Sequence, residues 1–366
     1  MRSITGQLTD QLARHVGTAG VAKASAFPVR TYRELMEHVA QLAYLNKDDL
    51  LFFRGQGQDY RNKAGASTIY PAIYRGERLS QEQIELRFDI LMSAAKRLCN
   101  ALSAHNVTGQ NDVRRRRYIQ WGILQHYEVC PTPLLDLTHS LRAACSFAFL
   151  ASDLGEPCVF VFGLPYITNR VSVNSEHDMA IVRLLSICPP DALRPYFQDG
   201  YLAGTDEVLT EYDSKDELDF NRRLIAKFTL SKSPSFWGRG FSPLPKNALY
   251  PSKDRFERIC AGVRKELGTD VEPGRLGQFL QDWTDLENVL LSAARQRHER
   301  VFSLREALSI LAREEKVPSG VIEELNAIRR LRNQAVHEPR GLQAHELTSG
   351  RERLASLRRK LKELGL

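Results

Sequence analysis

Leu51-Phe52-Phe53-Arg54-Gly55-Gln56 is the stretch that decides the fold of the N-terminal part of this chain. Its three leading apolar residues predict a short buried strand, and this strand brings Arg54 directly before Gly55. A cation at a strand end, beside a residue that lets a ligand or another backbone approach closely, is typical of a site for an anionic ligand. The alternative interpretation is an arginine that forms a salt bridge at the edge of a sheet.

A second motif lies downstream, where Gln125-His126-Tyr127 is followed by a proline-rich segment and a polar one. Together with Phe-Arg-Gly at residues 53–55, this motif resembles the FRG-domain family, whose second segment commonly reads Gln-His-Tyr-Gly-x-Pro-Thr-Arg-Leu-Leu-Asp-Trp-Thr-x-Ser-Pro. The matching positions are Gln125, His126, Tyr127, Pro131, Thr132, Leu134, Leu135, Asp136, Thr138 and Ser140, followed by Ala143, Ala144, Phe147 and Ala148 in the next helix.

The chain departs from the family pattern at four positions. These are Glu128 where the family usually has Gly, Pro133 in place of Arg, Leu137 in place of Trp, and Leu141 in place of Pro. The proline at position 133 weakens the expectation of a second cation beside Arg54. A further likeness at Tyr250-Pro251 extends the resemblance over roughly residues 30 to 260.

The order of these motifs is similar to that of the ADP-ribosyltransferase fold, and the resemblance implies NAD as a substrate. The histidines lack metal-ligand spacing, so we expect no metal. The resemblance places the cofactor-binding role on Arg54, Gln56, His126, Tyr127, Asp136 and Thr138. It places Ser140 at a catalytic position in the second strand region. When nicotinamide leaves with its electron pair, positive charge develops on the sugar, and a nearby carboxylate or amide oxygen lowers that barrier.

Two residues are candidates for that oxygen. Gln198 lies in Arg-Pro-Tyr-Phe-Gln-Asp-Gly (194–200), which resembles the Arg-x-x-x-Gln-x-Gly segment of the family. Glu207 precedes Val208-Leu209 and fits the more common transferase pattern of a glutamate that leads an apolar strand. We prefer Gln198, and an ordinary exposed polar residue is the alternative for each.

Length and composition predict a globular protein of two or three domains, because the chain has 366 residues with 43% hydrophobic and 26% charged residues. The six cysteines form no Cys-x-x-Cys pair, which favours free thiols in a reducing compartment over a disulfide framework. No signal-peptide core and no apolar run of membrane-spanning length is evident. We therefore expect a cytoplasmic location and no membrane partner.

Positive charge is concentrated at Arg114, Arg115, Arg116 and Arg117, within a chain of formal net charge +7. Tyr118 and Trp121 follow, and basic residues next to aromatic faces are typical of a groove for single-stranded nucleic acid. The alternative is the solvated first turn of an amphipathic helix that runs through Ile119 and Ile123, because consecutive helical residues do not share one face.

The C-terminal part is predicted to be a separate helical bundle, because three amphipathic segments and a final basic helix follow a break near residues 268–275. Ser303 and Glu306 form a predicted capping box. Arg332 and His337 form an Arg-x4-His motif that resembles the HEPN superfamily, whose active members cleave RNA across a dimer. Dimerisation, partner docking or nucleic-acid contact is the interpretation that we favour over cleavage.

The sequence thus predicts an α+β fold with an ADP-ribosyltransferase-like mixed β core in residues 1–267 and a HEPN-like all-α bundle in residues 268–366. The predicted function is NAD-dependent transfer of ADP-ribose to a nucleic acid, with RNA favoured, by a bacterial toxin or phage-defence effector. Such a role implies an antitoxin or chaperone as partner. The alternatives are an RNase that uses Arg332 and His337, and a non-catalytic module that binds nucleic acid or protein.

Overall fold

The computed structural model describes residues 1–75, 81–152, 155–205, 215–251, 254–269, 273–296, 301, 303–314, 316–337 and 344–365. The chain divides into two compact units, Met1–Val263 and Arg264–Leu366, and the division falls within helix α10 (Arg255–Thr269). The break that the sequence predicts after residue 267 lies in the same helix. Each unit is described by itself.

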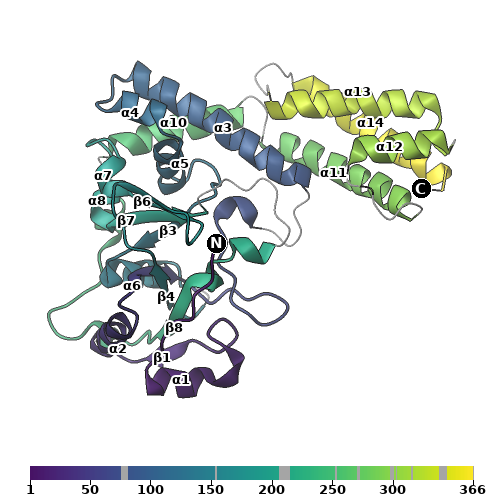
Figure 1. Cartoon of the computed structure of the whole chain (residues 1–366). Coiled ribbons are helices and arrows are strands. Elements are labelled where there is room, and N and C mark those ends of the chain that lie inside the picture. Colours follow the sequence, from purple (N-terminus) through teal and green to yellow (C-terminus); the bar gives the residue numbers. More distant parts are fainter. Residues whose placement is uncertain are drawn as a thin grey trace. The chain divides into compact units, whose positions relative to one another are not determined.

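The N-terminal unit is built on a mixed sheet with the strand order β1-β8-β4-β2-β3-β7-β6-β5, in which β1 and β8 are parallel and the other neighbours are antiparallel (Figure 1). The strands are β1 (Phe27–Val29), β2 (Leu50–Gln56), β3 (Leu135–Thr138), β4 (Cys158–Leu164), β5 (Val171–Asn174), β6 (Met179–Arg183), β7 (Gly200–Gly204) and β8 (Leu224–Leu230).

Helices surround this sheet and supply the segments between its strands. The α-helices are α1 (Asp10–Val16), α2 (Tyr32–Leu45), α3 (Gln81–Ala104), α4 (Gln110–Arg115), α5 (Arg117–His126), α6 (Leu141–Leu150), α7 (Leu184–Ile187), α8 (Arg194–Gln198), α9 (Lys246–Leu249) and α10. The short 3-10 turns are η1 (Gly17–Ala19), η2 (Ala72–Tyr74), η3 (Lys215–Leu218), η4 (Phe220–Arg223) and η5 (Pro234–Trp237). The coarse α+β prediction is confirmed.

The strand predicted at residues 51–54 is present as part of β2, and two further strands coincide with apolar runs of the sequence. β4 is buried at every position, as expected for a central strand, and β8 is buried at all positions but one. Helix α2 begins at Tyr32, because the side chain of Thr31 accepts a hydrogen bond from the amide of Glu34 at 3.1 Å and so caps its first turn.

Strands β2 and β3 lie next to each other but pair at one position only, Phe53 with Thr138. β2 runs on through Arg54 to Gln56 paired with β4, and β3 pairs along its length with β7. The second half of β2 and the first half of β3 therefore separate, and residues of both strands line a cavity there.

Helix α6 covers β2 on one face of the sheet, and Gly55 makes this close packing possible. A Cβ atom at Gly55 would lie 1.8 Å from the carbonyl oxygen of Ala144 and 2.8 Å from the amide nitrogen of Ala148. Since these are backbone atoms of α6, no side chain fits between the helix and the strand. The three residues of the Phe-Arg-Gly motif thus have different positions. Phe53 packs in the apolar core with α6, Gly55 lets α6 approach the strand, and Arg54 lines the cavity where β2 and β3 separate.

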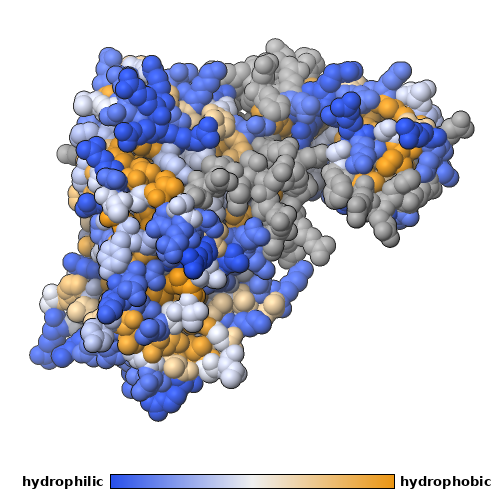
Figure 2. Space-filling model, in the orientation of Figure 1, coloured by the Kyte–Doolittle hydropathy of each residue, from blue (hydrophilic) through white to orange (hydrophobic). Residues whose placement is uncertain are grey.

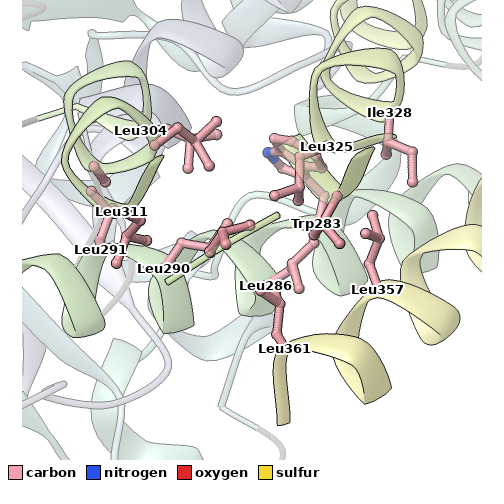
Figure 3. Packing of buried hydrophobic residues seen from close by; sticks show 14 of the residues in the cluster. Trp283, Leu286, Leu290, Leu291, Leu304, Leu311, Leu325, Ile328, Leu357 and Leu361 are labelled. Atoms are coloured by element: carbon pink, nitrogen blue, oxygen red, sulfur yellow. The ribbon is translucent and has the colours of Figure 1, made fainter. Parts of the chain in front are cut away.

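The C-terminal unit consists, in its described residues, of helices α11 (Pro273–Arg295), α12 (Leu304–Arg313), α13 (Ser319–His337) and α14 (Ala344–Glu363). Figure 3 shows how side chains from all four helices meet in one apolar cluster, in which Trp283 and Leu286 of α11 lie near Leu325 of α13 and Leu357 of α14. The predicted cap is confirmed, because Ser303 Oγ accepts from the amide of Glu306 at 3.2 Å.

All six cysteines are free thiols, as the sequence predicts. In the described part of the chain, no helix has both the length and the apolar composition that a membrane crossing requires. On the face drawn in Figure 2, hydrophobic residues form separate patches among hydrophilic ones.

Candidate functional site

A cavity of about 330 Å³ opens in the N-terminal unit where β2 and β3 separate. Its walls come from both strands and from the ends of α5, α6 and α8. The lining residues are Phe53, Arg54, Gly55, Arg75, Gln125, His126, Glu128, Asp136, Leu137, Thr138, Phe147, Ala151, Gln198, Gly200 and Tyr250. The volume is in the range of small-molecule and cofactor pockets, which are usually mostly apolar with a few converging polar groups.

Arg54 is the central cation of this cavity. Its Nη1 donates to the main-chain oxygen of Asp136 at 2.6 Å, while its Nε is buried and has no hydrogen-bond partner among the described residues. Burial, helped by nearby Arg75 and opposed by Asp136, lowers the pKa of Arg54 to about 10. The guanidinium is still charged at neutral pH, so a buried charged donor remains for a ligand.

Arg75 is a second cation in the same cavity, which the sequence did not reveal. The family pattern places a second arginine at position 133, where this chain has proline, whereas the structure brings in Arg75 from the end of η2. Its Nε donates to the main-chain oxygen of Tyr70 at 3.1 Å. A single exposed arginine after a short turn carries no recognisable sequence signal, so only the fold places it beside Arg54.

Asp136 is an anion that a chain of hydrogen bonds holds in place. Thr132 Oγ1 donates to Gln125 Oε1 at 2.8 Å, and Gln125 Nε2 donates to Asp136 Oδ2 at 2.7 Å. Nδ1 of buried His126 lies 3.6 Å from Asp136 Oδ1. Burial alone would raise the pKa of Asp136, but His126, Arg54 and Gln125 together hold it below its ordinary value.

Gln198 is buried at the end of α8 and lines the cavity. Its Nε2 donates to the main-chain oxygen of Leu249 at 2.8 Å, and in the described residues its Oε1 accepts no hydrogen bond. The Thr138 hydroxyl donates to the main-chain oxygen of Gln198 at 2.9 Å. Thr138 therefore fixes the end of α8 against β3, and Gln198 offers an oriented amide oxygen to a ligand.

Three predicted site residues lie outside the cavity wall. Ser140 caps α6, because its Oγ accepts from the amide of Ala143 at 3.2 Å. Gln56, at the end of β2, has a buried Oε1 without a hydrogen-bond partner among the described residues. Tyr127 is fully buried, and its hydroxyl donates to Asp254 Oδ2 at 2.7 Å. Burial and this hydrogen bond raise the pKa of Tyr127, so it supports the wall from behind.

The support behind the wall is completed by Arg194. Its guanidinium lies 5.1 Å from the ring centre of Tyr127 and 5.0 Å from that of Tyr250, and it forms an ion pair with Glu257. Tyr250 lines the cavity, so this cation–π arrangement fixes one wall.

The remaining predicted sites are not part of the cavity. Glu207 lies outside the described residues, so the choice between Gln198 and Glu207 is not settled by position. Arg332 is half-buried in α13 and donates from Nη1 to Asn333 Oδ1 at 2.9 Å, whereas the side chain of His337 lies outside what the structure describes.

The four arginines do not form the first turn of one helix, so the alternative interpretation of this run is wrong in that respect. Arg114 and Arg115 end α4, Arg116 has extended backbone between two helices, and α5 begins at Arg117. All four are exposed. Arg114 donates to Ser103 Oγ at 2.6 Å, and the guanidinium of Arg117 lies 5.6 Å from the ring centre of Trp121. Trp121 itself is buried, so its ring does not provide an open stacking face next to the run.

Glu128 explains one departure from the family pattern. Its φ is 54°, in the left-handed region that glycine adopts without steric cost, and glycine is the usual family residue at this position. A non-glycine residue in this conformation costs about 1–2 kcal/mol, part of which is offset by the greater freedom of glycine in the unfolded chain.

Replacing Glu128 with glycine is therefore expected to raise the free energy of unfolding of the N-terminal unit by about 0.5–1 kcal/mol. Urea denaturation measures this difference. Glu37→Gly is the matched control, because Glu37 lies within helix α2, where glycine destabilises by about 1 kcal/mol. A loss of stability with Glu128→Gly would show that contacts of the glutamate side chain outweigh its backbone strain.

Comparison of the chain with protein-family models, curated proteins and solved structures finds no match. The cavity combines two cations, two carboxyl side chains and an amide, from Arg54, Arg75, Asp136, Glu128 and Gln198, between walls that include Phe53, Phe147 and Tyr250. Such a set suits a ligand with a central phosphate group and with rings or sugars at its ends.

Proposed function

We propose that the N-terminal unit is an ADP-ribosyltransferase-like domain that binds NAD and transfers ADP-ribose to a nucleic acid, with RNA as the favoured acceptor. The single observation that carries this proposal is Arg54, a half-buried charged side chain whose buried Nε has no hydrogen-bond partner among the described residues, at the point where β2 and β3 separate. A pyrophosphate is an anion that such a donor binds, and Arg75 would share its charge.

The cavity would act on NAD mainly by orientation and electrostatics. As the bond between the ribose carbon and the nicotinamide nitrogen breaks, the electron pair leaves with nicotinamide and positive charge develops on the sugar. The ionised carboxylate of Asp136 would stabilise this charge, and Gln198 Oε1 would accept a hydrogen bond from a ribose hydroxyl. The acceptor atom then forms the new bond to the ribose carbon and loses its proton.

The acceptor is proposed from charge. The chain carries a formal net charge of +7 and exposes Arg114 to Arg117, and both features favour a polyanion. A protein that modifies nucleic acid in this way would fit a toxin or phage-defence role restrained by an antitoxin or chaperone. The C-terminal helices would serve dimerisation or partner docking.

Incubation of the full chain with adenylate-labelled NAD and separate pools of RNA, DNA and protein tests the function. We expect label to appear in the RNA pool with release of one nicotinamide per ADP-ribose transferred. Label in the protein pool alone would show that the acceptor is a protein and not RNA, while ADP-ribose transfer itself would stand. RNA cleavage that needs His337 and no NAD would contradict the proposal and favour a nuclease. Binding of RNA with neither reaction would favour a non-catalytic module.

In the proposed mechanism, Gln198 Oε1 accepts a hydrogen bond from a ribose hydroxyl of NAD. Gln198→Ala is expected to lower kcat for nicotinamide release by about 10- to 100-fold with a smaller change in KM, because the hydrogen bond strengthens as charge develops. Steady-state kinetics measures both constants. Gln41→Ala, at an exposed position of α2, is the matched control and should change neither.

Glu207→Ala decides between the two candidates for this role. We expect it to reduce turnover less than Gln198→Ala does. The reverse order would move the catalytic role to Glu207. A rise in KM with kcat unchanged in Gln198→Ala would show that Gln198 contributes to binding only.

A further inference from the structure

The loop after β8 has an unusual composition. We call residues 231–246 the basic aromatic loop, and it contains Lys232, Arg239 and Lys246 but no Asp or Glu. The side chain of Arg142, from helix α6, joins it by donating from Nε to the main-chain oxygen of Ser242 at 2.8 Å. The loop therefore contributes positive charge and no acidic residue of its own, which favours an anionic partner.

Aromatic rings gather on the same loop. Phe236 is buried against Phe149 and anchors the loop to the core. Trp237 stacks on Tyr32 of α2 with ring centres 5.2 Å apart and planes 24° apart, and Phe241 lies 5.0 Å from the same tyrosine ring. Of these rings Phe241 is 38% exposed and Trp237 is partly exposed, so part of the cluster lies at the surface.

In the sequence, Arg239 lies between Trp237 and Phe241. Gly238 and Gly240 flank it with φ values of 77° and 73°, and an added Cβ atom at either glycine would meet nothing within 4 Å. The glycines thus turn the backbone outward rather than pack it against the protein. Within the described residues, neither Arg239 nor Lys246 has an ion-pair partner, so both charges are open to a ligand. The guanidinium of Arg142 lies 4.5 Å from the ring centre of Phe241 and adds a fourth cation to the three of the loop.

The loop leads to the cavity. The amide of Leu244 donates to Ser146 Oγ of helix α6 at 2.8 Å, so the loop follows α6. It then enters α9, where the main-chain oxygen of Leu249 accepts the hydrogen bond from Gln198, and the next residue, Tyr250, lines the cavity. One continuous segment therefore connects the exposed rings with the proposed catalytic wall.

We infer that the basic aromatic loop, together with Tyr32 and Arg142, is a binding surface for single-stranded nucleic acid. Bases stack on exposed aromatic rings whatever their sequence, and phosphates pair with the neighbouring cations, which is how single-strand sites combine affinity with sequence tolerance. A duplex hides its base faces and would gain only the phosphate contacts. The role of this strand as ADP-ribose acceptor depends on the proposed function, but binding of the strand does not need NAD.

Fluorescence anisotropy of a labelled oligonucleotide of about 12 nucleotides, without NAD, tests the surface in the full chain. Single-stranded RNA, single-stranded DNA and duplex RNA are compared. We expect both single strands to bind more tightly than the duplex, and Trp237→Leu combined with Phe241→Leu to weaken single-strand binding by about 5- to 100-fold. Tyr44→Leu is the matched control, because Tyr44 is 82% exposed on α2 and should have no effect.

Arg239→Gln combined with Lys246→Gln is the second variant, and it changes no packed ring. The slope of log affinity against log salt is negative, and this variant should make it shallower by about 1.4, which corresponds to the loss of two phosphate contacts. Arg170→Gln, at an exposed turn, is the matched control and should leave the slope unchanged. Unaltered affinity and slope in both loop variants would overturn the inference. A loss that follows only replacement of Arg114 to Arg117 would overturn it too, and would place the nucleic acid on that arginine run. Equal affinity for duplex and single-stranded RNA would also overturn the inference, because it would exclude stacking of bases on the aromatic rings.

Discussion

Arg54→Gln is expected to reduce nicotinamide release and ADP-ribose transfer by about 100- to 1000-fold while the N-terminal unit remains folded. Removal of a buried charged partner of a phosphate costs about 2–5 kcal/mol, and the glutamine amide keeps a donor near the main-chain oxygen of Asp136. Radiolabel transfer gives the activity, and circular dichroism on heating gives the fold. Arg170→Gln, at an exposed turn, is the matched control and should keep full activity.

Arg54→Lys refines this prediction. A lysine keeps the charge but loses the planar arrangement of donors, so its activity should fall between those of the wild type and Arg54→Gln. If Arg54→Gln instead lost its cooperative melting transition together with activity, Arg54 would be a structural cation at a sheet edge. Full transfer by a well-folded Arg54→Gln protein would remove the arginine from the site.

Gly55→Ala is the second change with a large expected effect, and this effect is on stability. The new Cβ atom would lie 1.8 Å from the carbonyl oxygen of Ala144, so α6 or β2 must move. We expect a loss of about 3–5 kcal/mol of the free energy of unfolding, at the upper end of the costs known for overpacking. Urea denaturation gives this value, and hydrogen exchange in β2 and α6 locates the loss.

Gly262→Ala is the control for this substitution. Gly262 lies in α10, where an added Cβ atom meets nothing within 4 Å, so alanine should stabilise the helix by about 0.5–1 kcal/mol. A change of less than 1 kcal/mol in Gly55→Ala would mean that α6 does not pack on β2 as closely as the distances indicate.

The parts of the fold that could be predicted are those with a local signal. β4 is an uninterrupted apolar run, and α2 combines a cap at Thr31 with one apolar face, so each is specified by its own residues. The C-terminal helices follow the same rule, with Ser303 at the start of α12. Such signals fix the type of an element, and they do not fix which strands lie next to each other.

In the candidate site, the sequence motifs predict some of the residues correctly and others not. Arg54, His126, Asp136, Thr138 and Gln198 were identified from motifs, and the fold brings all five to one cavity. Ser140 was expected at a catalytic position, but its hydroxyl satisfies an amide at the start of α6. A serine before an apolar helix has the same sequence pattern in either role, and only the hydrogen bond distinguishes them.

The sequence does not predict that Arg75 lines the cavity or that β2 and β3 separate, and the reason is physical. Arg75 is 21 residues from Arg54 in the chain (75 − 54), and it reaches the cavity only through the path of the backbone between β2 and α3. The separation depends on β2 continuing with β4 while β3 continues with β7. Both are properties of long-range pairing, which a single sequence does not encode in any local pattern.

Titration of the full chain with NAD in a calorimeter tests the central claim, that the cavity between β2 and β3 binds NAD through Arg54. The account predicts saturable binding with one NAD per chain, competition by ADP-ribose, and little binding of nicotinamide alone, because the phosphates supply the main contacts. Arg54→Gln should weaken this binding by at least about 30-fold, while Arg170→Gln leaves it unchanged. Absence of saturable NAD binding by the wild-type chain, or equal affinity in wild type and Arg54→Gln, would contradict the account.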